Sequence, residues 1–126
     1  MTCFRSKFDP LWLSWVVGGV DNDGKPFLGH IDKLGTAFEC PVIATGYGAY
    51  IAVPLMRSWL ESGQPEKTEQ EAKEIIKNCL TVLYYRDARS WPKYSIAVVN
   101  KEGAKVEGPF EIKGNWNVAH YVRGYE

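Results

Sequence analysis

A capped amphipathic helix in the middle of the chain constrains the fold more than any other segment. Thr68 and Glu71 have the spacing of a capping box, in which two side chains satisfy free backbone N–H groups where a helix begins. An apolar stripe with helical spacing follows: Ala72, Ile75, Ile76, Cys79, Leu80 and Leu83. An earlier apolar stripe has the same spacing and contains Ala52, Leu55, Met56, Trp59 and Leu60. Residues 62–65 are expected to end the helix that carries it. We expect two adjacent helices that pack antiparallel.

Strand-like sequence lies on both sides of these helices. The patterns predict strands over residues 11–20, 27–33, 36–40 and 42–45, and again over 94–99 and 104–112. Turn-forming residues separate them at 21–24, 34–35 and 100–103. Gly108-Pro109 should place an edge or a bulge in the last strand, and residues 115–121 should form a short helix. This order predicts an α+β fold with its helices on one sheet face.

Composition excludes several classes of function. The 126 residues fit one domain, and their 15 basic and 15 acidic side chains cancel, so no overall charge favours nucleic acid or a membrane surface. No run of eighteen apolar residues could span a membrane. Cys3, Cys40 and Cys79 are widely spaced and predict reduced thiols, and neither His30 nor His120 has a partner at metal-ligand spacing. We expect no metal ion.

Two glycine-containing segments resemble nucleotide-binding loops only in part. Residues 19–25 have P-loop spacing, but Pro26 stands where a magnesium-binding hydroxyl belongs, and two aspartates would repel phosphate. Gly46-Tyr47-Gly48 lies between a strand and a helix, but Ile51 replaces the third glycine of a dinucleotide-binding fingerprint. We interpret both segments as turns and expect no cofactor.

The polar run at the end of the second helix has an ordinary structural interpretation. Arg86 would complement the helix dipole, and Asp87 would form a local ion pair with Arg86 or Arg89. Spacing alone therefore identifies no catalytic constellation.

Several short segments, in order and spacing, resemble the C-terminal half of a proteasome beta subunit. They are Arg5-Ser6-Lys7, Pro10-Leu11-Trp12, Phe27-Leu28-Gly29, residues 44–49 (Ala-Thr-Gly-Tyr-Gly-Ala), Pro54-Leu55, residues 82–90 (Val-Leu-Tyr-Tyr-Arg-Asp-Ala-Arg-Ser) and Asn115-Trp116. The resemblance implies that residues 1–126 form the C-terminal half of such a domain. It implies half of a four-layer α-β-β-α sandwich of the Ntn-hydrolase type.

The same resemblance implies a non-catalytic member of a threonine-protease family. Active members carry Gly-Ser-Gly where this chain has Tyr47 between glycines, and Asp-x-x-Ser-Gly where it has Asp87, Ser90 and then Trp91. Neither Thr2 nor Lys33 corresponds to the family's catalytic threonine or lysine. We therefore expect four degenerate family positions and no catalytic residue.

The implied function is to complete the beta ring of the 20S core particle, which carries out ubiquitin-dependent protein degradation. The implied partners are other proteasome alpha and beta subunits in the cytoplasm and nucleus, with no nucleic acid and no membrane. Two alternatives are a fragment of an active threonine protease and a stand-alone binding module. On its own, the chain should leave an apolar sheet face uncovered, carrying Trp12, Val16, Phe27 and Ile31.

Overall fold

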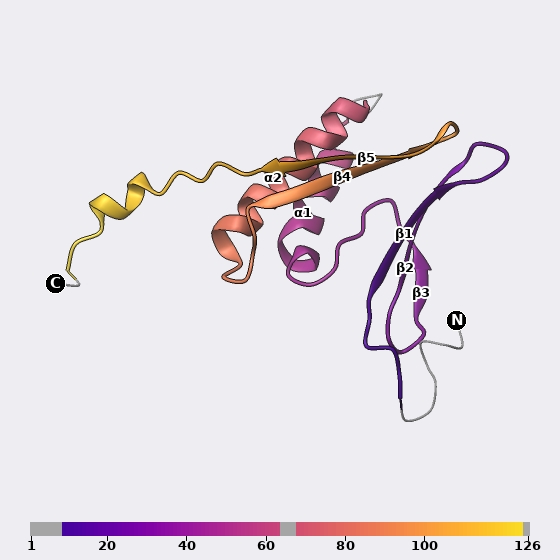
Figure 1. Cartoon of the computed structure of the whole chain (residues 1–126), viewed down its shortest axis with the longest axis horizontal. Coiled ribbons are helices and arrows are strands. Elements are labelled where there is room, and N and C mark those ends of the chain that lie inside the picture. Colours follow the sequence, from indigo (N-terminus) through magenta and orange to yellow (C-terminus); the bar gives the residue numbers. More distant parts are fainter. Residues whose placement is uncertain (1–8, 64–67, 125–126) are drawn as a thin grey trace.

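The computed structural model describes residues 9–63 and 68–124. Three strands come first, two helices follow, and a hairpin and a short 3₁₀ helix complete the described chain (Figure 1). The elements are β1 (Trp15–Val20), β2 (Pro26–Ile31), β3 (Ala37–Glu39), α1 (Gly48–Leu60), α2 (Glu69–Arg86), β4 (Lys93–Asn100), β5 (Gly103–Glu111) and η2 (Asn117–Tyr121). The order confirms the predicted α+β class.

The two helices run in opposite senses and pack on each other, as predicted (Figure 1). Thr68 and Glu71 form the complete capping box at the start of α2. The most buried contact joins Cys79 of α2 to Ala52 of α1, where the Cys79 Sγ lies 3.8 Å from the Ala52 carbonyl oxygen. At the end of α1, Ser62 Oγ donates to the Trp59 carbonyl, whereas the predicted stop residues Gln64 and Pro65 lie outside the described residues.

Strands β1, β2 and β3 form an antiparallel sheet in sequence order. The two predicted turns are present, with Gly24 at φ 83° and Gly35 at φ 85°, a conformation that glycine adopts without a Cβ clash. The strand expected over residues 42–45 is wrong, because these residues have no strand structure. The Cys40 N–H donates to the Leu28 carbonyl, and Pro41, which has no N–H, then prevents the ladder from continuing.

Strands β4 and β5 form a separate two-stranded hairpin. Between the pairs Tyr94–Phe110 and Ile96–Glu107 the register shifts, because β5 contains one residue more than β4. The extra residue falls at Gly108-Pro109, which confirms the predicted bulge. The short terminal helix begins two residues later than predicted, at Asn117, whose N–H donates to the Asn115 side chain.

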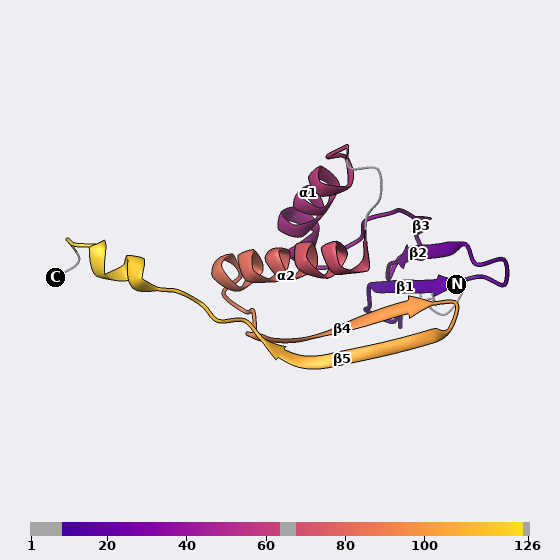
Figure 2. The same cartoon turned by 90° about the horizontal axis from the view of Figure 1, so that it is seen from above.

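The helix pair lies over one face of the β4–β5 hairpin (Figure 2). The first sheet lies beside this hairpin, with β1 in contact with β4. A Cβ at Gly24 would overlap the Lys101 side chain, so the tips of the two hairpins also meet. Residues 113–124, which we call the C-terminal segment, extend away from the body in both views. No helix among the described residues is long and apolar enough to cross a membrane.

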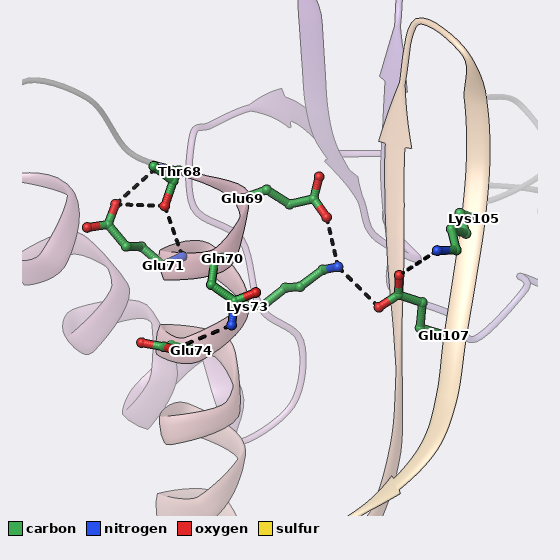
Figure 3. Close-up of polar contacts among 8 residues, drawn as sticks. All are labelled: Thr68, Glu69, Gln70, Glu71, Lys73, Glu74, Lys105 and Glu107. Carbon is green, nitrogen blue, oxygen red and sulfur yellow. Dashed lines mark hydrogen bonds and ion pairs between the residues drawn. The ribbon is translucent and has the colours of Figure 1, made fainter.

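Lys73 connects α2 to the hairpin (Figure 3). Its Nζ lies 2.7 Å from Glu69 Oε1 and 3.1 Å from Glu107 Oε2, while Lys105 Nζ lies 3.0 Å from Glu107 Oε1. The hydrogen bond to Glu69, followed by that to Glu107, raises the pKa of Lys73. Hydrogen bonds from Lys105 and then from Lys73 lower the pKa of Glu107. The charged form of Glu107 is therefore favoured by folding.

Few apolar side chains of the described chain are buried: Val42, Ala52, Cys79 and Ile112. The β1–β2 register places Trp15, Val17, Phe27 and Ile31 on one face of the sheet, and Val16 and Leu28 on the other. The sequence analysis placed Val16 on the same sheet face as Phe27 and Ile31. This prediction is wrong for Val16, which lies on the opposite face. Trp12 precedes β1, and its ring lies under Lys33 Nζ at 3.5 Å. Both faces of this sheet are apolar, which is typical of a sheet between two other layers.

The Glu107 ion pairs predict a specific acid dependence of stability. Because folding lowers the Glu107 pKa from its ordinary value of 4.5, its contribution is complete above pH 4.5 and is lost as the pH falls through the folded-state pKa. Glu107→Gln should therefore be less stable than the unmodified chain at neutral pH, with a difference that shrinks in acid. Denaturant unfolding at several pH values measures this. Glu102→Gln, at the exposed hairpin tip, is the control, and a pH-independent difference for Glu107→Gln would contradict the prediction.

Candidate functional site

The four sequence-predicted positions line one open cavity between the helix pair and the start of β4. Tyr47, Asp87, Ser90 and Trp91 all contribute to its wall, and its volume is about 520 Å³. The rest of the wall is mostly apolar and includes Ala52, Cys79, Leu83 and Ile112. Folding thus brings together residues that are some forty positions apart in the sequence.

Tyr47 lies immediately before α1, at the N-cap position. Its side chain makes no capping hydrogen bond and is 62% exposed, and its ring lies 6.5 Å from that of Tyr50. Glycine is favoured at position 46 by the backbone conformation and at position 48 by close packing. Gly46 has φ 61°, and a Cβ at Gly48 would lie 3.1 Å from the Ala44 Cβ. The Gly-x-Gly pattern is therefore explained by the turn that leads into α1, which confirms the interpretation as a turn although no strand directly precedes it.

Asp87 is the C-cap of α2, and its carboxylate stabilises the following turn. Its Oδ1 accepts a hydrogen bond of 3.0 Å from the backbone N–H of Arg89. The predicted ion pair of Asp87 with Arg86 or Arg89 is wrong, since none of the ion pairs among residues 9–63 and 68–124 includes Asp87. A short aspartate side chain reaches the backbone two residues ahead more readily than it reaches a guanidinium.

The Ser90 hydroxyl is also engaged by the backbone. Its Oγ lies 2.7 Å from the Asp87 carbonyl oxygen and 3.2 Å from the Tyr84 carbonyl oxygen, to which it donates. Tyr84 lies in the last turn of α2, where carbonyl groups lack a partner within the helix, whereas the Asp87 carbonyl, just beyond the helix, also accepts the Ser90 backbone N–H at 3.0 Å. The next residue, Trp91, also lines the cavity and is 74% exposed. The cavity wall therefore combines two large, exposed aromatic side chains, Tyr47 and Trp91, with a serine hydroxyl that donates to the backbone.

Sequence reasoning did not identify Cys79, Thr45 or Lys93 as part of this site, although all three line the cavity. Cys79 appeared only as a member of the α2 stripe. Burial raises the pKa of its thiol, which favours an uncharged, unreactive side chain. Thr45 and Lys93 could have been found only from their nearness in sequence to Gly46 and Trp91.

The histidines do not form a metal site in the part of the chain that the structure describes, where no three His, Cys, Asp or Glu residues are suitably grouped. His30 stacks on Phe38 with ring centroids 5.0 Å apart. Its Nδ1 is buried and has no hydrogen-bond partner among the described residues. His120 lies in η2.

Comparison with known proteins gives a consistent set of relatives. The proteasome subunit family matches residues 1–99. The chain is 48% identical over 122 residues to proteasome subunit beta type-4 of Xenopus laevis, covering 97% of this chain and 50% of the relative. It is 43% identical to proteasome subunit beta type-4 of Drosophila melanogaster, covering 96% of this chain and 45% of that protein.

A relative from yeast has a different subunit name. The chain is 40% identical to proteasome subunit beta type-7 of Saccharomyces cerevisiae, covering 96% of this chain and 47% of the relative. The chain therefore spans about half the length of the curated relatives it matches.

The backbone contacts of Ser90 predict a structural rather than a chemical role for this side chain. Ser90→Ala should lower the free energy of unfolding by about 1 kcal/mol, the usual net value of one hydrogen bond. Denaturant unfolding followed by tryptophan fluorescence measures the change. Ser95→Ala, in exposed strand β4, is the matched control. Equal stability of the two variants would contradict the assigned role of Ser90.

Proposed function

The chain belongs to the proteasome subunit family, and from this premise we propose that it is a non-catalytic structural subunit of the 20S core particle. Its role in this proposal is to complete a beta ring, which requires complementary surfaces and no nucleophile. The observation that carries the proposal is similarity to beta type-4 subunits over 96–97% of this chain.

The geometry around the degenerate positions supports the non-catalytic part of the proposal. In the resemblance described above, active members have a small serine where Tyr47 stands and a glycine where Trp91 stands. The Ser90 hydroxyl and the Asp87 carboxylate both make local backbone contacts at the end of α2. In this proposal they are parts of a helix-ending turn.

A four-layer α-β-β-α sandwich is the finer fold that we propose for the complete subunit. The α1–α2 pair would be one outer layer, and the strands would belong to the two inner layers. Two features support this arrangement. The helices cover only one face of the β4–β5 hairpin (Figure 2), and the other face carries small apolar residues such as Ala97 and Val106. Apolar side chains also lie on both faces of the β1–β2–β3 sheet.

The partners in this proposal are other alpha and beta subunits of the same particle, and the setting is ubiquitin-dependent proteolysis in the cytoplasm and nucleus. The relatives are named as proteasome subunits, which supports partners of this kind. Assembly would also remove exposed aromatic side chains such as Tyr50 and Tyr121 from water.

Fractionation of the source cell tests the proposal. The tagged chain should co-purify with other beta subunits in a high-mass particle, because its exposed apolar surfaces require partners. The purified chain alone should hydrolyse no fluorogenic peptide. A small free species without other beta subunits would contradict the structural role. Peptide hydrolysis by the chain, abolished by a threonine-directed inhibitor, would contradict the non-catalytic role.

A further inference from the structure

A hollow outside the cavity described above lies where the C-terminal segment leaves the body. It has a volume of about 390 Å³ and lies between the end of α2 and the beginning of the segment. Its walls are Val82, Tyr85, Arg86, Asn115, Trp116 and Val118. We call this hollow the junction notch. None of the degenerate positions Tyr47, Asp87, Ser90 and Trp91 contributes to it, so it is a separate feature of the surface.

Direct contacts hold the two walls of the junction notch together. The Asn115 N–H donates to the Tyr85 hydroxyl oxygen at 2.7 Å, and the Trp116 ring meets the Tyr85 ring edge-on, with centroids 5.1 Å apart. The chain also passes close to Tyr84, because a Cβ at Gly114 would lie 2.9 Å from that ring. A partner would therefore meet walls that are already ordered, which reduces the entropy cost of binding.

The polar groups of the notch lining are the Asn115 amide, the Tyr85 hydroxyl and one cation. Trp116 is 54% exposed and Val118 is 63% exposed, so apolar surface is available to a partner. Arg86 contributes the single charged side chain of the lining and makes no ion pair with any described residue. No carboxylate lines the notch.

The C-terminal segment adds no carboxylate near Arg86. Residues 113–124 contain Lys113 and Arg123 but no aspartate or glutamate, while Glu111 precedes and Glu126 follows them in the sequence. The charge that a partner meets in the notch itself is therefore that of Arg86. A guanidinium beside an apolar hollow is suited to a carboxylate that lies next to an apolar side chain.

We propose that the junction notch is a docking site for a neighbouring protein chain that inserts an apolar side chain flanked by a carboxylate. The carboxylate pairs with Arg86, and the apolar side chain lies against Trp116 and Val118. The inference rests on the proposed function in one respect: the neighbouring chain is another subunit of the same particle. Tyr85 is the positioning residue that holds the two walls together.

A zero-length cross-link tests this pairing directly. Arg86→Lys in the full chain, expressed in the source cell, places an amine where a water-soluble carbodiimide can join it to a carboxylate in contact. We expect mass spectrometry of the purified particle to locate a cross-link from position 86 to an aspartate or glutamate of another subunit. Arg89→Lys, which is exposed but outside the notch, is the matched control and should give no such product.

Retention of the chain in the particle gives an independent readout. Arg86→Gln should be retained about tenfold less than the unmodified chain in a salt wash, as expected for the loss of one charge-assisted contact. Arg89→Gln should behave like the unmodified chain. If the unmodified chain enters the particle but position 86 gives no interchain cross-link and Arg86→Gln is fully retained, the notch proposal is wrong while the proposed function stands. An unmodified chain that never enters a particle would overturn both.

Discussion

Helix α2 makes the contacts on which the rest of the described chain depends. Its middle packs against α1 through Cys79 and Ala52, and its first half is joined to β5 by the Lys73–Glu107 ion pair. Its last turn bears Tyr85, which binds the C-terminal segment, and Tyr84, whose carbonyl accepts a hydrogen bond from Ser90 Oγ. The capping box and the polar turn thus define both ends of one helix that positions the hairpin, the cavity and the notch.

The second constraint is the shortage of covered apolar surface. Large side chains such as Trp15, Val17 and Phe27 remain about half exposed in the first sheet. Complete burial of one such side chain stabilises a protein by roughly 1.5–3 kcal/mol, and the net stability of a domain is only about 5–15 kcal/mol. Because these side chains are already about half covered, covering the rest of several of them contributes roughly half of that value for each, which is still large beside the net stability of a domain and favours a subunit that is completed by further layers and partners.

Local signals predicted the elements whose causes are local. The capping box at Thr68, the turns at Gly24 and Gly35 and the bulge at Gly108-Pro109 depend on backbone geometry that a few residues determine, and all are present. The strand expected over residues 42–45 is absent although its composition is strand-like, because Pro41 has no N–H with which to continue the ladder beyond Cys40. The Asp87 ion pair failed because a nearer backbone N–H satisfied the carboxylate.

The candidate site was predictable only through family resemblance. Tyr47 and Ser90 are far apart in the chain, and no spacing rule brings them to one cavity wall. The resemblance supplied that grouping, and the structure added the local hydrogen bonds that explain Asp87 and Ser90. The junction notch had no sequence signal, because it depends on a hydrogen bond between Tyr85 and Asn115, thirty residues apart.

Amide hydrogen exchange over residues 15–31 tests most directly whether the first sheet is an inner layer of an assembled subunit. Exchange should be compared between the chain in its native high-mass particle and the purified chain alone. The account predicts strong protection of β1 and β2 in the particle and faster exchange in the isolated chain, where both sheet faces meet water. Equal exchange in the two states would contradict this prediction. A chain that exists only as a free species, with a fully protected sheet, would contradict it as well.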